Sequence, residues 1–206
     1  MADRLSIYRG ALRLLGPSNL ASLTEDIPDK RALDAAWQDS VTSMLERGMW
    51  NFAIRTVELS VDENVEPLFG FKHAFSKPSD WVRTVSISEY ADFHEGLRRF
   101  EDETQYWHCD PEKLYVRYVS NDEAYGRNIG AWRQHFADAL SAYLAFQCGL
   151  PISADKGNRN DLYQLFKELL ADAKTKDAVD ERVRDKPPGR LTRSRNAGNH
   201  RDRYRG

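Results

Sequence analysis

Apolar residues recur at helical spacing in two segments near the start of the chain. Residues 3–15 hold the first stripe, which comprises Leu5, Tyr8, Leu12 and Leu15. Gly16 and Pro17 follow it and predict the end of the helix, because proline cannot continue the hydrogen-bond ladder. Residues 29–47 hold the second stripe, which comprises Leu33, Trp37, Val41, Met44 and Leu45. Both segments are therefore predicted to be amphipathic helices.

After Gly48 the spacing of apolar residues changes. Trp50 and Phe52 stand at the change, and from Val57 to Val61 every second residue is apolar, which is the period of a strand. This segment predicts a passage from a layer of helices into a sheet. The two aromatic side chains are expected to be buried where the layers meet.

Residues 53–119 carry the patterns of short strands. The predicted strands are 57–61, 69–75, 81–87, 100–107 and 114–119, the fourth being interrupted by Glu101, Asp102 and Glu103. In 81–87, alternation predicts one face of Trp81, Arg83, Val85 and Ile87 and another of Val82, Thr84 and Ser86. The connections are too short for crossover helices, so antiparallel pairing is predicted.

Helical spacing returns at Asn128. The stripe here comprises Ile129, Trp132, Phe136, Leu140, Tyr143 and Leu144. Gly149 and Pro151 are predicted to end this helix. A last helix is predicted over residues 162–173, and Pro187-Pro188-Gly189 breaks the helical pattern beyond it.

The order of these elements predicts an α+β protein. Residues 1–52 and 128–185 are expected to form one discontinuous domain, a bundle of about four helices. Residues 53–127 are expected to form an inserted antiparallel β-sheet subdomain. Residues 186–206 are expected to form an extended basic C-terminal tail, because they hold too few apolar residues to order alone.

The formal net charge of −2 conceals an uneven distribution. From Lys186 to Gly206 there are seven Lys and Arg residues and one acid, Asp202, so the tail carries +6. The first 185 residues then hold 23 bases and 31 acids, a net −8. The body and the tail are therefore expected to meet different partners.

Motifs for catalysis and metal binding are absent from the sequence. It contains no P-loop, no dinucleotide-binding glycine motif, no nucleophile elbow and no H-E-x-x-H. His108 and Cys109 are adjacent on a predicted strand, so they point to opposite faces and cannot share one metal ion. The run Glu101-Asp102-Glu103 could bind a cation, but such runs are usually solvated edges or loops. We expect no enzymatic activity, no catalytic residue, no cofactor and no metal.

Two further features bear on the surroundings of the protein. No run approaches the roughly 20 apolar residues that span a bilayer, so no membrane partner is expected. Cys109 and Cys148 are far apart in the sequence and lie in different kinds of element, which favours a reducing compartment over a disulfide scaffold.

The basic tail is the candidate partner-docking segment. Its candidate residues are Arg190, Arg193, Arg195, Arg201, Arg203, Tyr204 and Arg205. These side chains suit a nucleic acid, because arginine binds phosphates and tyrosine stacks on bases. They suit a protein partner equally well, because the guanidinium group pairs with carboxylates. Composition does not separate the two.

The order of the pieces resembles the head-to-tail adaptor, or connector, family of tailed bacteriophages, which includes the tail tubular protein A of short-tailed phages. The segments that carry the resemblance are YRGALRLLG with LASL, GMWNFAIRTVEL, HAFSKPSDWVRTVSI, LYVRYVSND and AYLAFQCGLPIS. They cover most of residues 5–173 in the family's order, and W-N-F-A with P-S-D-W-V-R is the most specific part. The chain beyond Lys186 lies outside the resemblance.

The resemblance implies a structural virion protein. Members form a ring, typically of twelve subunits, beneath the portal of a filled capsid. The implied partners are further copies of the chain, the portal protein and the next tail component, a nozzle or tail hub. The implied location is the head–tail junction of the virion, after synthesis in the host bacterial cytoplasm.

The resemblance also implies that DNA passes through the lumen of the ring without sequence-specific binding. The acidic body agrees with this role, because phosphates find no cations there to displace their counterions. The alternative is a non-enzymatic nucleic-acid-binding protein that uses the basic C-terminal arm.

Overall fold

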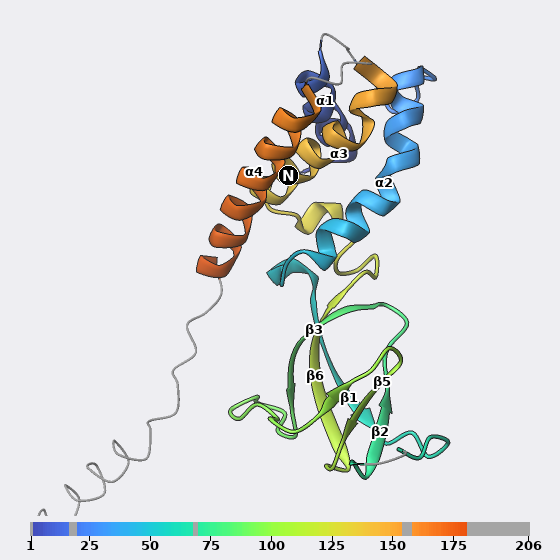
Figure 1. Cartoon of the computed structure of the whole chain (residues 1–206), viewed down its shortest axis with the longest axis vertical. Helices are drawn as coiled ribbons and strands as arrows, with labels where there is room; N and C mark the ends of the chain where they lie inside the picture. Colours follow the sequence, from blue (N-terminus) through green and yellow to red (C-terminus); the bar gives the residue numbers. More distant parts are fainter. Residues whose placement is uncertain (1, 17–19, 68–69, 154–157, 181–206) are drawn as a thin grey trace, which may run out of the picture.

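The computed structural model describes residues 2–16, 20–67, 70–153 and 158–180. The α-helices are α1 (Arg4–Leu15), α2 (Pro28–Glu46), α3 (Gln134–Ser153) and α4 (Asn158–Asp180). The strands are β1 (Ile54–Ser60), β2 (His73–Ser76), β3 (Trp81–Ser88), β4 (Glu101–Asp102), β5 (Tyr106–Cys109) and β6 (Lys113–Ser120). The predicted mixed α+β class is confirmed. The helices occupy one end of an elongated molecule and the strands the other (Figure 1).

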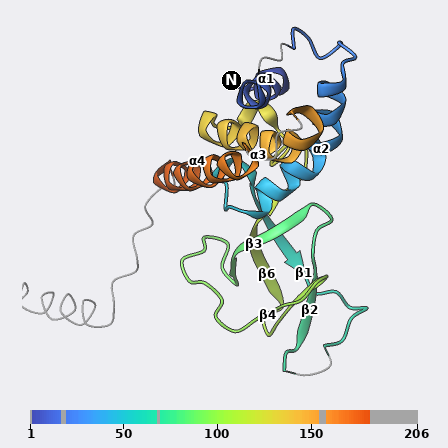
Figure 2. The same cartoon turned by 45° about the horizontal axis from the view of Figure 1, so that its top comes forward.

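Helix α3 lies at the centre of the helical end, where α1, α2 and α4 all pack against it (Figure 2). Helix α1 begins with a reciprocal cap, in which the Asp3 carboxylate accepts from the Ser6 N–H and the Ser6 hydroxyl accepts from the Asp3 N–H. It approaches α3 closely at Gly10, where an added Cβ would lie 2.8 Å from the Ser141 Oγ. Ser141 Oγ also donates to the Ile7 carbonyl, so both helices share one polar contact inside an apolar core.

Trp50 and Phe52 lie between the helices and the sheet, as predicted, with Trp50 fully buried and Phe52 partly so. Trp50 is 1% exposed, and its indole N–H donates to the Met44 carbonyl at the end of α2. Its ring meets Phe136 of α3 edge to face, with centroids 4.9 Å apart, and Phe52 meets the same ring at the same distance. Phe52 is half-buried. These two rings connect α2, α3 and the start of β1.

The strands form two small antiparallel sheets, ordered β1-β6-β3 and β2-β5-β4. Strands β1 and β6 pair over their whole length, from Ile54 opposite Val119 to Ser60 opposite Lys113. The residues where the chain enters and leaves the β region are therefore neighbours. A shared apolar cluster joins the two sheets; its buried residues are Phe75, Ile87, Trp107, Cys109, Leu114, Val116 and Tyr118.

The predicted alternation of β3 is wrong at Thr84, which bonds to Trp81, and at Val85, whereas Ile87 lies in the same cluster as Trp81, as predicted. The pairing of β3 with β6 shifts register between Trp81 and Arg83 and again between Thr84 and Ser86. A bulge adds a residue to one strand and so reverses the faces of the residues beyond it. Val85 accordingly packs with Val82 against the core of the helices, whereas Ile87 lies in the cluster between the sheets.

Two other strand predictions were too long. The strand predicted over 69–75 is β2, His73–Ser76, and residue 69 lies outside the described part of the chain. The segment 100–107 divides into the two-residue β4 and the strand β5, with Glu103 in the connection. The carboxylates that interrupt the apolar pattern therefore mark the break between two strands.

The predicted end of the third helix at Gly149 and Pro151 is also wrong. Residues 129–131 form a 3-10 turn, and α3 begins at Gln134 and continues to Ser153. A proline removes one ladder hydrogen bond, but packing can hold the rest of the turn in place. Here Cys148 contacts the Ala32 carbonyl of α2, and Gly149 lies against Leu15 and Leu162. Helix α4 likewise extends beyond the predicted 162–173 at both ends.

Candidate interaction surfaces

The predicted docking residues of the tail lie outside the described part of the chain. They are Arg190, Arg193, Arg195, Arg201, Arg203, Tyr204 and Arg205. The contacts that bear on function are therefore those of the body. They comprise four groups of polar side chains that connect one element to another, which we call joints, and hollows on the surface.

Asp80 forms the first joint, where three strands converge. Its carboxylate accepts from the hydroxyls of Ser120 and Tyr118 on β6 and from the guanidinium of Arg55 on β1. Burial alone would raise the pKa of Asp80, but these hydrogen bonds outweigh it and hold the pKa below its usual range. Burial and the contact with Asp80 raise the pKa of the Tyr118 phenol. The Asp of P-S-D-W-V-R thus anchors β1 and β6 to the start of β3.

Lys77 and Thr84 form a second joint, which connects the two sheets. Thr84 Oγ1 accepts from the indole N–H groups of Trp81, at 3.2 Å, and Trp107, at 3.1 Å, and it donates to Asp102 at 2.7 Å. Lys77 pairs with the same Asp102, and its Nζ lies 3.6 Å from the centroid of a Trp81 ring. The Lys77 side chain is only 5% exposed, whereas the Asp102 side chain is 34% exposed, so the joint is buried on the lysine side and reaches solvent at the carboxylate.

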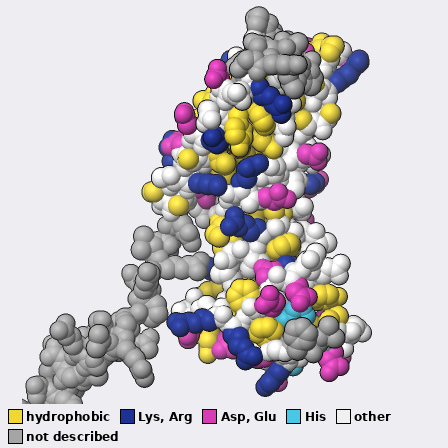
Figure 3. All heavy atoms as spheres, viewed as in Figure 1, with side chains coloured by type: hydrophobic (Ala, Val, Ile, Leu, Met, Phe, Trp, Pro, Cys, Tyr) yellow, Lys and Arg dark blue, Asp and Glu magenta, His cyan; other side chains and the backbone are white. Residues whose placement is uncertain are grey.

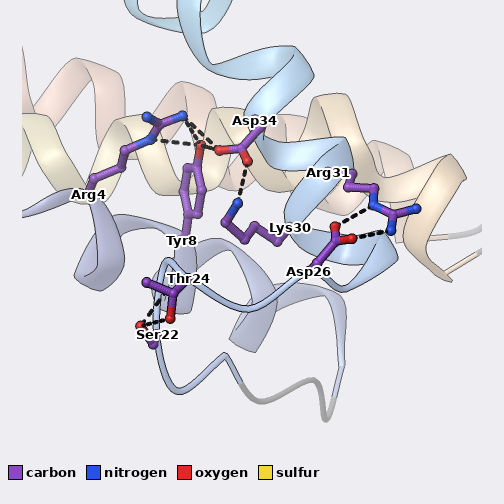
Figure 4. Close-up of polar contacts among 8 residues, drawn as sticks. All are labelled: Arg4, Tyr8, Ser22, Thr24, Asp26, Lys30, Arg31 and Asp34. Atoms are coloured by element: carbon purple, nitrogen blue, oxygen red, sulfur yellow. Dashed lines mark hydrogen bonds and ion pairs between the residues drawn. The ribbon is translucent and has the colours of Figure 1, made fainter.

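A third polar group connects α1 to α2 (Figure 4). Asp34 Oδ1 accepts from the Tyr8 hydroxyl and from Arg4, each at 2.8 Å, while Asp34 Oδ2 accepts from Lys30. The guanidinium of Arg4 also lies 4.8 Å from the centroid of the Trp37 ring. Burial and the bond to Asp34 raise the pKa of Tyr8, so its hydroxyl remains a proton donor. Every charged member is satisfied, which is typical of a structural network.

Asp177 near the end of α4 forms the last joint, with the turn after Trp50. It accepts from the Asn51 backbone N–H at 3.0 Å, and the Asn51 amide donates to the Asp177 carbonyl at 2.6 Å. Asp177 is 6% exposed, and burial raises the pKa of its carboxyl group. Helix α4 is thereby fixed to the point where the chain passes from helices to sheet.

A hollow of about 470 Å³ lies between α1, α3 and α4. Its apolar lining includes Ile7, Leu14, Ala137, Leu165 and Leu169, and we call it the helical groove. Figure 3 shows hydrophobic side chains gathered on the helical half of the molecule with Lys and Arg side chains around them. Contiguous apolar surface bordered by charge is typical of a protein–protein contact.

A basic hollow of about 330 Å³ lies where α2, β3 and α4 meet. Arg47, Arg83 and Lys174 line it together with Met49, which is 48% exposed. Within the described ranges, none of these three cations is within ion-pairing distance of a carboxylate; the salt bridges of the body involve other residues. Asp177 also lines the hollow, but burial favours the neutral form of its carboxyl group, so the three cations leave the hollow with net positive charge.

His108 and Cys109, the adjacent residues considered as metal ligands, are instead buried residues of a strand. His108 and Cys109 are buried on β5, and burial raises the pKa of the Cys109 thiol to about 12. Among the described residues, no three His, Cys, Asp or Glu side chains are arranged to hold a metal ion. In the same part of the chain no helix has the length and apolar character to cross a bilayer.

Sequence reasoning found the segments that carry the joints but missed their chemistry. Thr84 and Asp102 are 18 positions apart, and Asn51 and Asp177 are 126 apart, so no local spacing connects them. Lys77 and Asp80 lie between the strands predicted over 69–75 and 81–87, where the strand pattern is interrupted. The local signal was a lysine and a carboxylate close to Trp81, in a region otherwise patterned as strand.

No family model matches the chain, and no curated protein matches it.

Proposed function

We propose that this chain is a structural virion protein of the head-to-tail adaptor type. Copies of it form a ring, of about twelve by the resemblance, that joins the capsid portal to the tail and extends the DNA channel. Residues 1–52 and 128–185 act as one helical bundle and residues 53–127 as an inserted β subdomain. The partners are further copies, the portal protein and a nozzle or tail hub.

The observation that carries the proposal is the position of the resembling segments in the fold. GMWNFAIRTVEL supplies Trp50 and Asn51, which connect the helices to the sheet. KPSDWVRT supplies Lys77 and Asp80, which connect strand to strand. A resemblance confined to exposed positions would reflect composition alone. This one falls on buried joints, which support a shared framework.

Surface left open on the body supports assembly into a ring. Among the described strands, β1 and β3 each pair with β6 alone, so each has one edge free of the ladder. The helical groove adds apolar surface at the other end of the molecule. Open edges and apolar grooves are what a neighbouring subunit covers in a closed oligomer.

Electron microscopy of the purified chain, alone and with its portal protein, tests the proposal. We expect closed rings that stack coaxially on the portal and that remain after washing in 1 M salt (about seven times a physiological concentration). A chain that stays monomeric in both samples would contradict the proposal.

The alternative, a nucleic-acid-binding protein, is favoured by one observation. Arg47, Arg83 and Lys174 of the basic hollow form no ion pair in the described part of the chain, and burial favours the neutral form of Asp177, which also lines it. Titration with duplex DNA over a range of salt distinguishes the two functions. For a phosphate binder, the logarithm of the binding constant falls with the logarithm of the salt concentration, with a slope near −0.9 for each phosphate contact. An adaptor shows no tight DNA binding and remains bound to the portal protein.

A further inference from the structure

A pocket of about 610 Å³ at the sheet end of the molecule has an unusual lining. Glu66, Glu101 and Glu103 contribute carboxylates to it, and Phe71 and Tyr106 contribute aromatic rings. We call it the acidic pocket. Of the described residues that line it, none is a lysine or arginine. Figure 3 shows acidic side chains gathered beside a histidine at this end of the molecule.

The negative charge of the acidic pocket is only partly offset by the protein. Asp102, between the two pocket glutamates of the run, is taken by Lys77 and Thr84. Glu103 Oε2 lies 3.2 Å from Nε2 of His108, a residue that is 8% exposed and lines the pocket. The other ring nitrogen of His108, Nδ1, is buried and has no hydrogen-bond partner among the described residues. Buried polar atoms without partners are uncommon in complete sites.

The combination of carboxylates and aromatic rings suits a guanidinium group. Arginine forms paired hydrogen bonds to a carboxylate and stacks on an aromatic face, whereas lysine does only the first, and as a point charge. The protein already uses this arrangement beside the pocket. Arg99 lies 5.3 Å from the centroid of the Phe71 ring and pairs with Asp110 at 3.1 Å.

We propose that the acidic pocket binds an arginine side chain from residues 186–206 of a neighbouring copy in the ring. This inference rests on the proposed function, because it needs a second copy beside the first. The segment carries six arginines and one lysine, a net +6, against the three carboxylates of the pocket. The 26 residues beyond Asp180 span roughly 85 Å when extended, enough to reach another subunit.

Photo-crosslinking in the full chain tests the inference. Tyr204, between Arg203 and Arg205, is replaced by p-benzoylphenylalanine, and chains of normal isotope content are mixed with 15N-labelled chains before illumination. We expect crosslinked peptides that join residue 204 of one chain to residues 101–108 of the other, identified by mass spectrometry. Crosslinks within one chain only, or to other surfaces only, would overturn the inference.

Matched variants make the test specific. The double variant Glu101→Gln, Glu103→Gln should lower the yield of the crosslink to the acidic pocket by about tenfold. This corresponds to roughly 1.4 kcal/mol of lost charge-assisted hydrogen bonding. Glu123→Gln, an exposed carboxylate in the loop after β6, should leave it unchanged. An equal yield from all three proteins would contradict arginine binding, provided that circular dichroism shows equal melting temperatures.

Micrographs of the same samples separate this inference from the proposed function. Rings that form without a pocket crosslink would overturn the inference and leave the adaptor function standing. A crosslink to the portal protein alone would do the same and would assign the tail to that partner. Absence of rings with and without the portal would overturn both.

Discussion

Two carboxyl groups at the joints of this protein, the partly buried Asp80 and the buried Asp177, have pKa values shifted in opposite directions. Hydrogen bonds from Ser120, Arg55 and Tyr118 stabilise the ionised form of Asp80. Asp177 has the Asn51 N–H as its partner, and burial favours its neutral form. Ionisation of Asp80 therefore stabilises the fold as pH rises, whereas ionisation of Asp177 destabilises it.

The first prediction concerns the pH dependence of these two groups. The lowered pKa of Asp80 gives stability that is present above the unfolded value of about 3.9 and is lost as pH falls through the folded value. The raised pKa of Asp177 gives stability that is present below about 3.9 and is lost as pH rises through the folded value. Urea unfolding of the wild type and of Asp80→Asn and Asp177→Asn, between pH 3 and 7, measures both.

We expect the advantage of the wild type over Asp80→Asn to grow as pH rises. The wild type should lose ground to Asp177→Asn over the same interval. Differences that change in the same direction for both variants would contradict the assigned pKa shifts.

Trp37 is the largest of the buried side chains of α2. It is 6% exposed, meets the Tyr8 ring edge to face at 5.4 Å and lies 6.0 Å from the Trp132 ring. Trp37→Ala should lower the free energy of unfolding by about 3–5 kcal/mol, since it leaves a cavity beside Tyr8 and Trp132. Val179→Ala, at a side chain that is 79% exposed, is the control and should change it by less than about 0.5 kcal/mol.

The local hydrophobic pattern predicted which helices and strands are present, but it missed where several of them begin and end. Helix α1 was predicted within one residue, because Asp3 caps it and Gly16 ends it. The end of α3 and the length of α4 depend on contacts with α1, α2 and the turn at Asn51, which no window of sequence contains. The faces of β3 depend on bulges that only its partner strand reveals. Tertiary contacts overrode local signals at each of these places.

Gly126 in the return from β6 to α3 tests how tightly the two ends of the molecule meet. A Cβ there would lie 2.1 Å from the Ser120 carbonyl and 2.9 Å from a methyl of Leu45. Gly126→Ala should therefore destabilise the fold by about 3 kcal/mol, because backbone must move. Gly96→Ala, whose nearest contact would be at 3.9 Å, should be nearly neutral in the same thermal melt.

The whole molecule has two unlike ends, and assembly should affect them differently. Amides on the free edges of β1 and β3 should exchange hydrogen more slowly in the ring than in the monomer, if neighbours cover those edges. Amides of β6, which is paired on both sides, serve as the internal reference. Hydrogen-exchange mass spectrometry at two protein concentrations gives the comparison. If assembly changes the exchange rates of the edge strands no more than those of β6, the subunit contacts lie elsewhere.

The pairing of Ile54 with Val119 also has a consequence for the order of folding. Helices α1 and α2 find their main partner only when α3 has been synthesised, and the Ser141 to Ile7 bond spans 134 positions. The strands between them contact one another and can close first. Once β1 and β6 have paired, the C-terminal end of α2 and the N-terminal end of α3 are near each other. The entropic cost of closing this loop, about 4 kcal/mol, is then compensated by strand pairing before the helices dock.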